Sequence, residues 1–327
     1  MSAPLLDIRG LSISFGTYQG RAHVLDRASL TVNQGEVMGL VGETGCGKSV
    51  LSRAVLRIIP SPPGSIDAGE ILFEGRDLLK LPRTDMRRLR GERISMIFQE
   101  PMNSLNPVFT VGNQMREVVR AHRSASRAEA TDACLEMLAA VRLPEPASVL
   151  RAYPHELSGG MRQRVMIAMA LICNPSLLLA DEPTTALDVT VQGQILAILA
   201  ELAERQGLSI LFVTHDMGVV AQLCNRVAVM YAGQVVEVAD VQSIFARPAH
   251  PYTRGLIASI PGRSSGGELY AIPGSVPSPI DPPPGCRFRP RCPHAASSEC
   301  GGIAPEMIRV APDHSVACHL FNQDGLS

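Results

Sequence analysis

The octapeptide GETGCGKS at residues 42–49 decides how the rest of this sequence is interpreted. It follows the apolar run EVMGLV (36–41), which is typical of a short buried strand. It leads into residues 48–59, which are apolar at helical spacing and stop before Pro60. Because the pattern G-x-x-x-x-G-K-[ST] requires this order of strand, turn and helix, we predict a phosphate-binding loop here rather than a chance glycine-rich turn.

A loop of this kind binds phosphate with its backbone. Its glycines let N–H groups turn inward, and the helix that follows attracts anions to its N-terminus. Lys48 is expected to contact the β- and γ-phosphates of ATP, and the Ser49 hydroxyl to bind Mg²⁺. The ATP- and Mg²⁺-binding residues predicted for this segment are Gly42, Glu43, Thr44, Gly45, Cys46, Gly47, Lys48, Ser49 and Val50.

A second part of the site is predicted at LLLADE (177–182), an apolar run that ends in two acids. Asp181 can hold Mg²⁺ through water, and Glu182 can polarise the attacking water as a general base. Many buried strands end in an acidic loop, so this run alone would be weak evidence. Its place after a phosphate loop is what favours the nucleotide site.

The chain as a whole indicates an α/β fold. Strand-like runs at 176–180, 209–214 and 226–231 alternate with helical segments such as 191–204, which predicts a mainly parallel sheet. Together with the phosphate loop, this pattern resembles the RecA-like P-loop NTPase fold. The short strands of the first 100 residues predict an antiparallel β subdomain, and residues 103–164 an inserted helical subdomain. Residues 1–240 would form the nucleotide-binding domain, and 241–327 an irregular extension rich in Cys and Pro.

Composition narrows the possible functions. Lys and Arg number 30 and Asp and Glu number 31, a balance that argues against nucleic acid as the main partner. No apolar run approaches the roughly 18–20 residues that cross a bilayer, and the N-terminus has no signal-peptide pattern. We therefore expect a soluble, cytoplasmic protein that reaches a membrane only by docking onto other subunits.

The segment LSGGMRQR (157–164) resembles the signature of the ABC ATPases. A phosphate loop alone is also found in kinases, GTPases and helicases, whereas the segment 157–164 is not typical of those classes. The resemblance implies that a helix start here caps the γ-phosphate of ATP bound by an opposite subunit, so two chains complete each site. The signature residues are Leu157, Ser158, Gly159, Gly160 and Met161.

Other family elements occur in the expected order. Gln99 resembles the Q-loop glutamine, Asp188 lies in a segment similar to the D-loop, and His215 resembles the switch histidine. The resemblance assigns catalytic roles to Glu182, His215 and Gln99. It also implies an aromatic ring stacked on adenine, for which Phe15 is our candidate and Tyr18 the rival.

Three segments resemble the oligopeptide and dipeptide importers: QEPMNSLNP (99–107), HPYT (250–253), and the Pro-rich tail that begins at 272–274. The resemblance implies an ATP-hydrolysing motor at the cytoplasmic face of the inner membrane. Its partners would be a related but non-identical ATPase subunit, two transmembrane permease subunits and, indirectly, an external solute-binding protein. Peptides are the expected cargo, with nickel, opines and sugars as alternatives.

A soluble ABC ATPase that acts on ribosomes or DNA is the competing class. Such proteins carry two motif sets or a long coiled-coil insertion, and neither is visible in this sequence. The basic stretch 83–93 is interleaved with apolar residues, so we expect a solvated helix face.

Four cysteines crowd the end of the chain: Cys286, Cys292, Cys300 and Cys318. Four thiolates can bind zinc or an iron–sulfur cluster, and unligated thiols are the remaining alternative. Similar tails in this importer branch are associated with a [4Fe-4S] cluster, which we favour. Arg287, Arg289 and Arg291 are expected to lower the thiol pKa values. Substitute ligands would be His294, His314 and His319, whereas the four earlier cysteines are expected to be packing or loop residues: Cys46, Cys134, Cys173 and Cys224.

Overall fold

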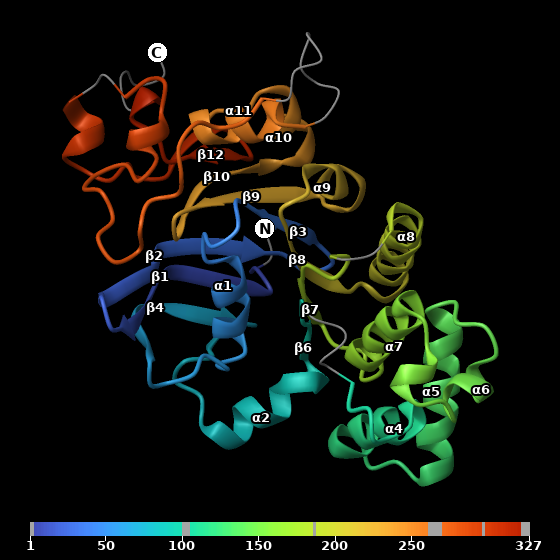
Figure 1. The fold of residues 1–327 in the computed structure, drawn as a ribbon. Coiled ribbons are helices and arrows are strands. Elements are labelled where there is room, and N and C mark those ends of the chain that lie inside the picture. The colour runs from blue at the N-terminus through green and yellow to red at the C-terminus, as the bar shows by residue number, and fades with distance from the viewer. Residues whose placement is uncertain (1–2, 100–104, 186–187, 261–269, 296–297, 322–327) are drawn as a thin grey trace. The chain divides into compact units, whose positions relative to one another are not determined.

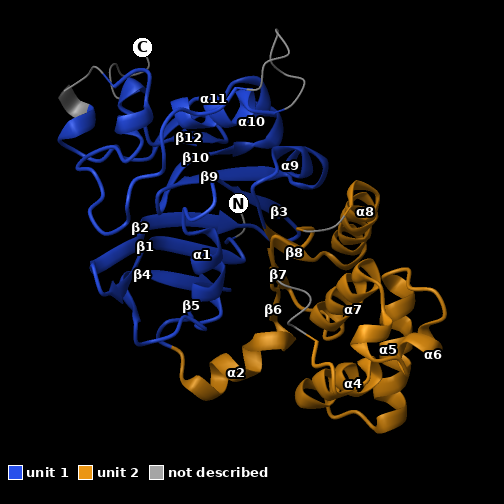
Figure 2. Cartoon of the chain, in the orientation of Figure 1, with its two compact units in different colours: residues 1–80, 213–327 blue, residues 81–212 orange. Residues whose placement is uncertain are grey.

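A computed structural model describes residues 3–99, 105–185, 188–260, 270–295 and 298–321. The chain forms two compact units (Figure 2). Unit 1 contains residues 1–80 and 213–327, and unit 2 contains residues 81–212. Unit 2 is therefore an insertion within the sequence of unit 1.

Unit 1 begins with an antiparallel sheet whose strand order is β2-β1-β4-β5 (Figure 1). The strands are β1 (Leu6–Thr17), β2 (Gly20–Val32), β4 (Gly64–Phe73) and β5 (Arg76–Asp77). In β1 buried residues alternate with more exposed ones, as expected for a sheet with one face on a core. This sheet is the predicted antiparallel subdomain.

A second set of strands in unit 1 places the phosphate loop. β3 (Val37–Val41) is buried throughout and pairs in parallel with β9 (Arg226–Tyr231). β10 (Gln234–Asp240) pairs antiparallel with β9. A buried parallel strand such as β3 delivers its C-terminal end to the edge of the sheet where ligands of α/β proteins bind. The predicted strand at 226–231 is confirmed.

The C-terminal extension (residues 241–327) is more regular than the sequence predicts. Its helices are α10 (Val241–Ala246) and α11 (Pro251–Ala258), and short 3₁₀ turns occur at Arg289–Arg291, Ser298–Gly301 and His319–Phe321. β11 (Ile308–Ala311) and β12 (His314–Val316) form a hairpin, and β12 pairs with β10. The expectation of an irregular extension is corrected for these short helices and for the hairpin. The hairpin strands of four and three residues are too short to show a period in the sequence.

Among its described residues, unit 2 contains two buried strands and most of a third. β6 (Ile94–Ile97) pairs in parallel with β7 (Leu177–Asp181), and β8 (Ser209–Thr214) neighbours β7 and returns the chain to unit 1. The runs predicted at 176–180 and 209–214 are therefore strands. β7 ends at Asp181, so the predicted Mg²⁺-binding residue lies at the end of a strand, as the sequence predicts.

Several helices of unit 2 begin with a side-chain N-cap. Thr110, Ser126 and Ser158 each accept a backbone N–H with their side chains at the starts of three helices. Ser126 and Glu129 add a capping box, which marks a helix start in sequence. The helices are α4 (Val111–His122), α5 (Arg127–Ala140), α6 (Pro146–Val149), α7 (Gly159–Leu171) and α8 (Val189–Gln206).

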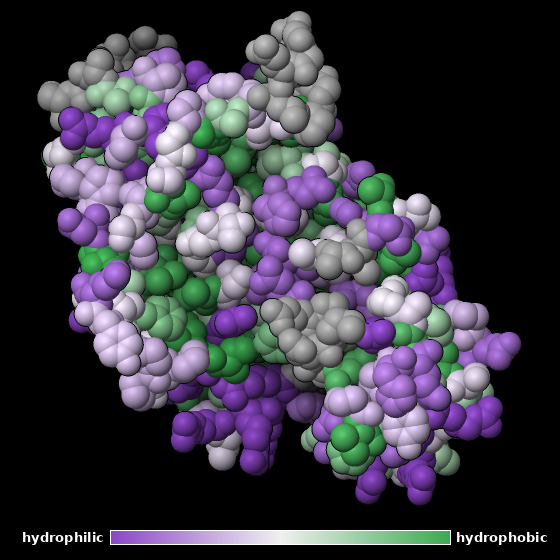
Figure 3. Space-filling model, in the orientation of Figure 1, coloured by the Kyte–Doolittle hydropathy of each residue, from purple (hydrophilic) through white to green (hydrophobic). Residues whose placement is uncertain are grey.

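The basic stretch of unit 2 forms the helix α2 (Arg83–Glu92). Met86 and Leu89 are buried on one side, whereas the arginines of this helix are mostly exposed. The surface over α2 is accordingly hydrophilic in Figure 3. The predicted solvated helix face is confirmed. None of the helices in the described ranges is both long enough and apolar enough to span a membrane.

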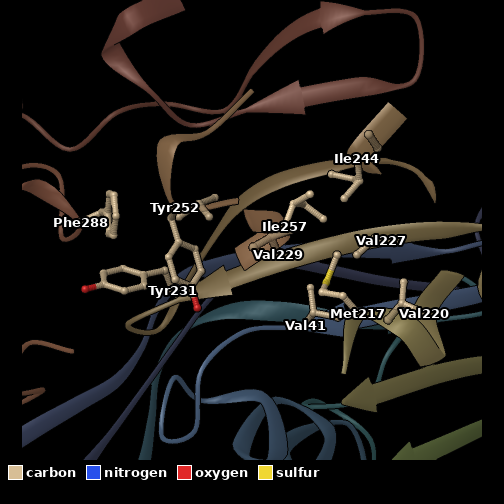
Figure 4. Close-up of a cluster of buried hydrophobic side chains, with 12 residues drawn as sticks. Val41, Met217, Val220, Val227, Val229, Tyr231, Ile244, Tyr252, Ile257 and Phe288 are labelled. Carbon is tan, nitrogen blue, oxygen red and sulfur yellow. The ribbon is translucent and has the colours of Figure 1, made fainter. Parts of the chain in front are cut away.

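Part of the core of unit 1 joins β9 to α11 and to the segment around Phe288 in the C-terminal extension (Figure 4). The rings of Tyr231 and Tyr252 lie 4.6 Å apart, and Phe288 packs at 5.2 Å from the first and 5.4 Å from the second. All three are almost completely buried. Aromatic contacts at these distances stabilise a fold beyond simple burial, so this cluster fixes the extension to the sheet that places the phosphate loop.

Candidate nucleotide-binding site

The phosphate loop (residues 42–49) connects β3 to α1 (Lys48–Val55) in unit 1. Gly42 and Gly47 have positive φ angles of 158° and 105°. A Cβ atom at Gly47 would lie 2.7 Å from Leu25 Cδ2 and 2.9 Å from the Val24 carbonyl oxygen, and one at Gly42 would collide with the Met230 carbonyl oxygen. Only glycine fits both positions, so the neighbouring strands dictate the loop's tight turn.

Lys48 is folded onto this loop. Its Nζ donates to the Gly42 carbonyl oxygen at 2.8 Å and to the Glu43 carbonyl oxygen at 3.1 Å, and the residue is 5% exposed. Thr44 and Gly45 form the exposed crest, and Ser49 and Val50 are half-buried. The ammonium group is thus held beside the turn that the sequence assigns to phosphate.

Cys46 is the one loop position with a thiol. It is 1% exposed, and burial raises its pKa above the ordinary value, although Lys48 partly opposes this. The thiol is therefore protonated at neutral pH. This agrees with the predicted packing role, which also fits the burial of Cys134 and Cys173. Burial raises the pKa of Cys224 to about 12.

Unit 2 brings the predicted base and the Q-loop glutamine together. Gln99 Nε2 donates to Glu182 Oε2 at 2.9 Å, and Thr185 Oγ1 donates to the same oxygen at 3.0 Å. Asp181, just before, is fully buried at the end of β7. Glu182 has φ +48°, a conformation that is uncommon for residues other than glycine and is concentrated at functional sites. Thr185 was not identified from the sequence, because a lone threonine gives no signal there.

The signature segment forms the start of α7. Ser158 is its N-cap, and its Oγ accepts from the Met161 backbone N–H at 3.3 Å. Ser158 and Gly159 are exposed, so this terminus presents backbone N–H groups at the surface, where an anion can bind. Leu157 is buried at 5% exposure. A Cβ at Gly160 would lie 3.0 Å from Val191 Cγ1 of α8, which explains the need for a small residue at this position.

Two further contacts order the segment after Glu182. Gln163 of α7 donates from Nε2 to the Pro183 carbonyl oxygen, and Asp188 caps α8 by accepting from the Val191 N–H at 2.9 Å. The other predicted D-loop residues, Ala186 and Leu187, lie outside the described residues, as do residues 100–104 of the Q-loop segment. The contact of Gln163 had no signal in the sequence.

His215 and the two aromatic candidates lie in unit 1. His215 is exposed directly after β8, where Asp216 caps the next helix, α9 (Met217–Leu223). Phe15 is half-buried, and a Cβ at Gly64 would approach its Cε1 to 3.0 Å, whereas Tyr18 is fully exposed in the β1–β2 turn. The adenine contact of either ring stays a prediction.

The predicted residues are therefore divided between the units. Unit 1 contains the phosphate loop, Phe15 and His215, and unit 2 contains Gln99, Leu157, Ser158, Gly159, Gly160, Met161, Asp181, Glu182 and Asp188.

The four cysteines of the C-terminal extension influence one another. The Cys286 N–H donates to the Cys300 carbonyl oxygen at 3.0 Å. Burial, with a smaller contribution from the thiols of Cys286, Cys292 and Cys300, raises the pKa of Cys318 to about 11, although the Leu320 backbone opposes this. All eight cysteines lie in the described part of the chain, where none forms a disulfide bond. Within the same ranges no three His, Cys, Asp or Glu side chains are arranged to hold a metal ion, so this geometry gives the predicted iron–sulfur cluster no support.

The expected effect of the neighbouring arginines on these thiols is wrong. Burial raises the pKa of Cys286 and of Cys292 above the ordinary value, and the arginines do not reverse it. The reason is that Arg287 and Arg291 are paired with carboxylates elsewhere, at Asp26 and Glu43.

Two of the three possible substitute ligands are also engaged, whereas His294 is exposed. His314 Nε2 lies 2.7 Å from Glu237 Oε1, and His319 Nε2 lies 2.8 Å from the Ile303 carbonyl oxygen.

The glycine-rich loop after a buried strand, with a signature helix and an acidic strand end, defines a P-loop ATPase cassette. Solved structures agree. The dimeric structure of the bacterial ABC transporter cassette MJ0796 has a TM-score of 0.65 and 26% identity, covering 72% of this chain and 98% of that chain. A structure of the same cassette in a post-hydrolysis state, bound to ADP and Pi, matches equally well.

Sequence comparisons name the family. The family model described as "ABC transporter" matches residues 25–185, and "Oligopeptide/dipeptide transporter, C-terminal region" matches 236–300. A probable peptide ABC transporter ATP-binding protein of Sinorhizobium fredii is 50% identical, covering 98% of this chain and 96% of its own. The oligopeptide transport ATP-binding protein OppD of Bacillus subtilis is 48% identical, covering 98% and 90%. This chain belongs to the ABC transporter ATP-binding proteins and is an ABC ATPase.

Proposed function

We propose that this chain is the ATP-hydrolysing motor of an importer for oligopeptides, dipeptides or a related solute. The observation that carries the proposal is the Gln99–Glu182 hydrogen bond at the end of β7, in a chain that also contains an intact phosphate loop. The extension matched by the oligopeptide/dipeptide transporter model, together with relatives named for peptide transport, supports the cargo class.

The roles of the site residues follow from their chemistry. Backbone N–H groups of the phosphate loop and Lys48 would bind the phosphates, and Ser49 and Asp181 would hold Mg²⁺, which neutralises phosphate charge when bound. Glu182 would accept a proton from the attacking water while Gln99 orients its carboxylate. The water oxygen then bonds to the γ-phosphorus, and the bond from that phosphorus to the bridging β–γ oxygen breaks to give ADP and phosphate.

A second chain would complete each site. The exposed helix start at Ser158 and Gly159 is suited to a γ-phosphate bound by a partner. The dimeric cassette among the similar structures supports this arrangement. We propose a related, non-identical ATPase as the partner, two transmembrane permeases as the driven subunits and an external binding protein that supplies the solute. The chain would act at the cytoplasmic face of the inner membrane. We also propose the domain division 1–240 and 241–327, with the helical subdomain at about 103–164.

The [4Fe-4S] cluster, with zinc as its alternative, is a further part of the proposal and depends on the donor set alone. Four cysteine thiols within one segment are donors that suit a soft metal. Iron and acid-labile sulfide should be measured on anaerobically purified chain and on a Cys286→Ser variant. Iron and sulfide that disappear with this substitution would support the cluster, and zinc alone would contradict it.

The test of the main proposal is ATP hydrolysis by the chain assembled with its partner and permeases. Glu182→Gln should bind Mg-ATP but lose turnover, because the amide cannot accept the proton, and nucleotide should stay trapped in the closed pair. Hydrolysis by this variant at the parental rate would show that Glu182 is not the base. Purification with ribosomes or DNA instead of permeases would favour the competing class.

A further inference from the structure

An ion pair connects the C-terminal extension to the phosphate loop. Arg291 Nη1 donates to Glu43 Oε2 at 2.6 Å, and Nη2 donates to Glu43 Oε1 at 3.0 Å. The Arg291 side chain is 4% exposed and that of Glu43 is 27% exposed. A two-pronged pair of this kind fixes both the place and the orientation of the carboxylate.

Arg291 is itself held in place from several sides. Its Nε donates to the Pro273 carbonyl oxygen at 2.8 Å, and Nη2 also donates to the Ile272 carbonyl oxygen at 3.2 Å. The guanidinium lies 5.8 Å from the centre of the Tyr231 ring, within the range of a cation–π contact. The ion pair is therefore anchored on the side of the extension, and the loop residue Glu43 is the part that it restrains.

Three more contacts support the phosphate loop, directly or through the β9–β10 turn. The Glu43 backbone N–H donates to Tyr252 Oη at 2.9 Å, so α11 holds the loop beside the ion pair. At the other end of the loop, the Gly233 N–H donates to the Cys46 carbonyl oxygen at 2.9 Å, and Arg287 donates to the adjacent Ala232 carbonyl oxygen. The extension thus supports the loop at Glu43 directly and at Cys46 through the β9–β10 turn.

The charge of Glu43 gives this support a chemical consequence. A carboxylate in an anion-binding loop repels phosphate and attracts the lysine that should contact it. Lys48 Nζ already lies 3.1 Å from the Glu43 carbonyl oxygen, so a released Glu43 side chain would be within reach of that ammonium group. While Arg291 holds both carboxylate oxygens, Lys48 is kept for the nucleotide.

We propose that Arg291 is a positioning residue for nucleotide binding, which neutralises Glu43 and keeps its carboxylate away from Lys48. The inference rests on the proposed ATP site and adds to it a contribution from the C-terminal extension. Arg291 does not touch the nucleotide in this account and acts through Glu43. An ion pair that merely anchors the extension would be the structural alternative.

The experiment measures the dissociation constant of a non-hydrolysable ATP analogue with Mg²⁺ on the purified full chain, by calorimetric titration. Arg291→Ala should weaken binding by about tenfold, because a charge-assisted pair is lost and Glu43 competes for Lys48. Arg291→Lys keeps the charge without the planar fork and should give an intermediate value. The matched control is Arg289→Ala, which removes an exposed arginine two residues away in the same 3₁₀ turn.

The discriminating variant is Glu43→Gln combined with Arg291→Ala. When Glu43 is uncharged, loss of Arg291 should change the constant by less than about threefold relative to Glu43→Gln alone, since no carboxylate remains to compete. If Arg291→Ala weakened analogue binding equally in the parental chain and in the Glu43→Gln chain, Arg291 would only anchor the extension. The same conclusion would follow if Arg291→Ala bound the analogue as tightly as the parental chain. Should Arg291→Ala not fold, Arg291→Lys in the two backgrounds decides in the same way. Failure of the parental chain to bind the analogue would instead overturn the proposed function.

Discussion

Gln99 and Glu182, 83 positions apart in the sequence, share a 2.9 Å hydrogen bond within unit 2. The amide donates to Oε2 of the carboxylate, an oxygen that Thr185 also contacts. A general base is effective only when its orientation is fixed relative to the water it activates. This pair links the Q-loop to the proposed chemistry.

Replacement of Gln99 by Ala should therefore slow hydrolysis more than it weakens nucleotide binding. We expect turnover to fall by about ten- to hundredfold, because the base keeps its charge but loses an orienting partner. Steady-state ATPase assays on the assembled transporter measure both quantities. Gln114→Ala is the control, since Gln114 also donates side-chain hydrogen bonds in unit 2, to the Asn106 and Phe109 carbonyl oxygens rather than to a proposed catalytic group. Equal rates for Gln99→Ala and the parental chain would contradict the prediction.

Gly47→Ala should damage both the fold and the loop. The residue has φ +105°, and the new methyl would meet Leu25 and Val24. We expect the free energy of unfolding to fall by about 1–3 kcal/mol and nucleotide affinity to drop at least about tenfold. Gly207→Ala supplies the comparison: it also has a positive φ, at the end of α8, but has no atom within 4 Å of its Cβ position. Gly207→Ala should lose stability but keep its nucleotide affinity. If Gly47→Ala and Gly207→Ala weakened nucleotide binding equally, a special role for the loop would be contradicted.

Ser158→Ala tests the signature helix. Loss of the cap should cost about 1 kcal/mol of stability, and it should also lower ATPase activity, since Ser158 is proposed to face the partner's γ-phosphate. Ser126→Ala removes an equivalent cap from α5 in the same unit. Thermal unfolding should shift similarly for both variants, whereas only Ser158→Ala should reduce turnover. A similar loss of turnover in Ser126→Ala would mean that capping alone explains the effect.

His250 should make stability depend on pH. Burial lowers its pKa to about 4, although Glu237 opposes this and Arg254 adds to it. In the unfolded chain the pKa is about 6.5, so between these values the unfolded state binds the extra proton. Stability is therefore unaffected by this group above about pH 6.5 and decreases as the pH falls toward 4, by about 2 kcal/mol at pH 5.

His250→Asn checks this expectation, because asparagine can still accept the Tyr252 N–H that caps α11. Denaturant unfolding at pH 7.5 and pH 5 should show a smaller loss in the variant than in the parental chain. An identical loss in both would place the pH dependence elsewhere.

The sequence was informative where a local pattern has one physical explanation. Three local patterns predicted their structures correctly. The glycines of the phosphate loop form a tight turn before a helix, the apolar run before Asp181 is a buried strand, and a helix begins after Ser158. Contacts between distant segments could not be predicted in this way. Thr185 carries no signal in the sequence. Gln163 and Tyr252 lie in segments quoted for their family resemblance, but nothing in those segments predicts the hydrogen-bond partners that folding gives them. The arginines near the tail cysteines show the opposite case. Their adjacency in sequence suggested that they lower the thiol pKa values, but in the folded chain Arg287 pairs with Asp26 and Arg291 pairs with Glu43.

The hairpin β11–β12 has a practical consequence for anyone who shortens this protein. Because Val316 pairs with Glu237, β12 covers the outer edge of β10, and His314 supplies a partner to the buried Glu237 carboxylate. A chain cut before Ile308 would leave that edge unpaired and open to strands from other molecules. It would also leave an anion in the interior with one contact fewer. We expect such truncations to aggregate before they reveal anything about catalysis.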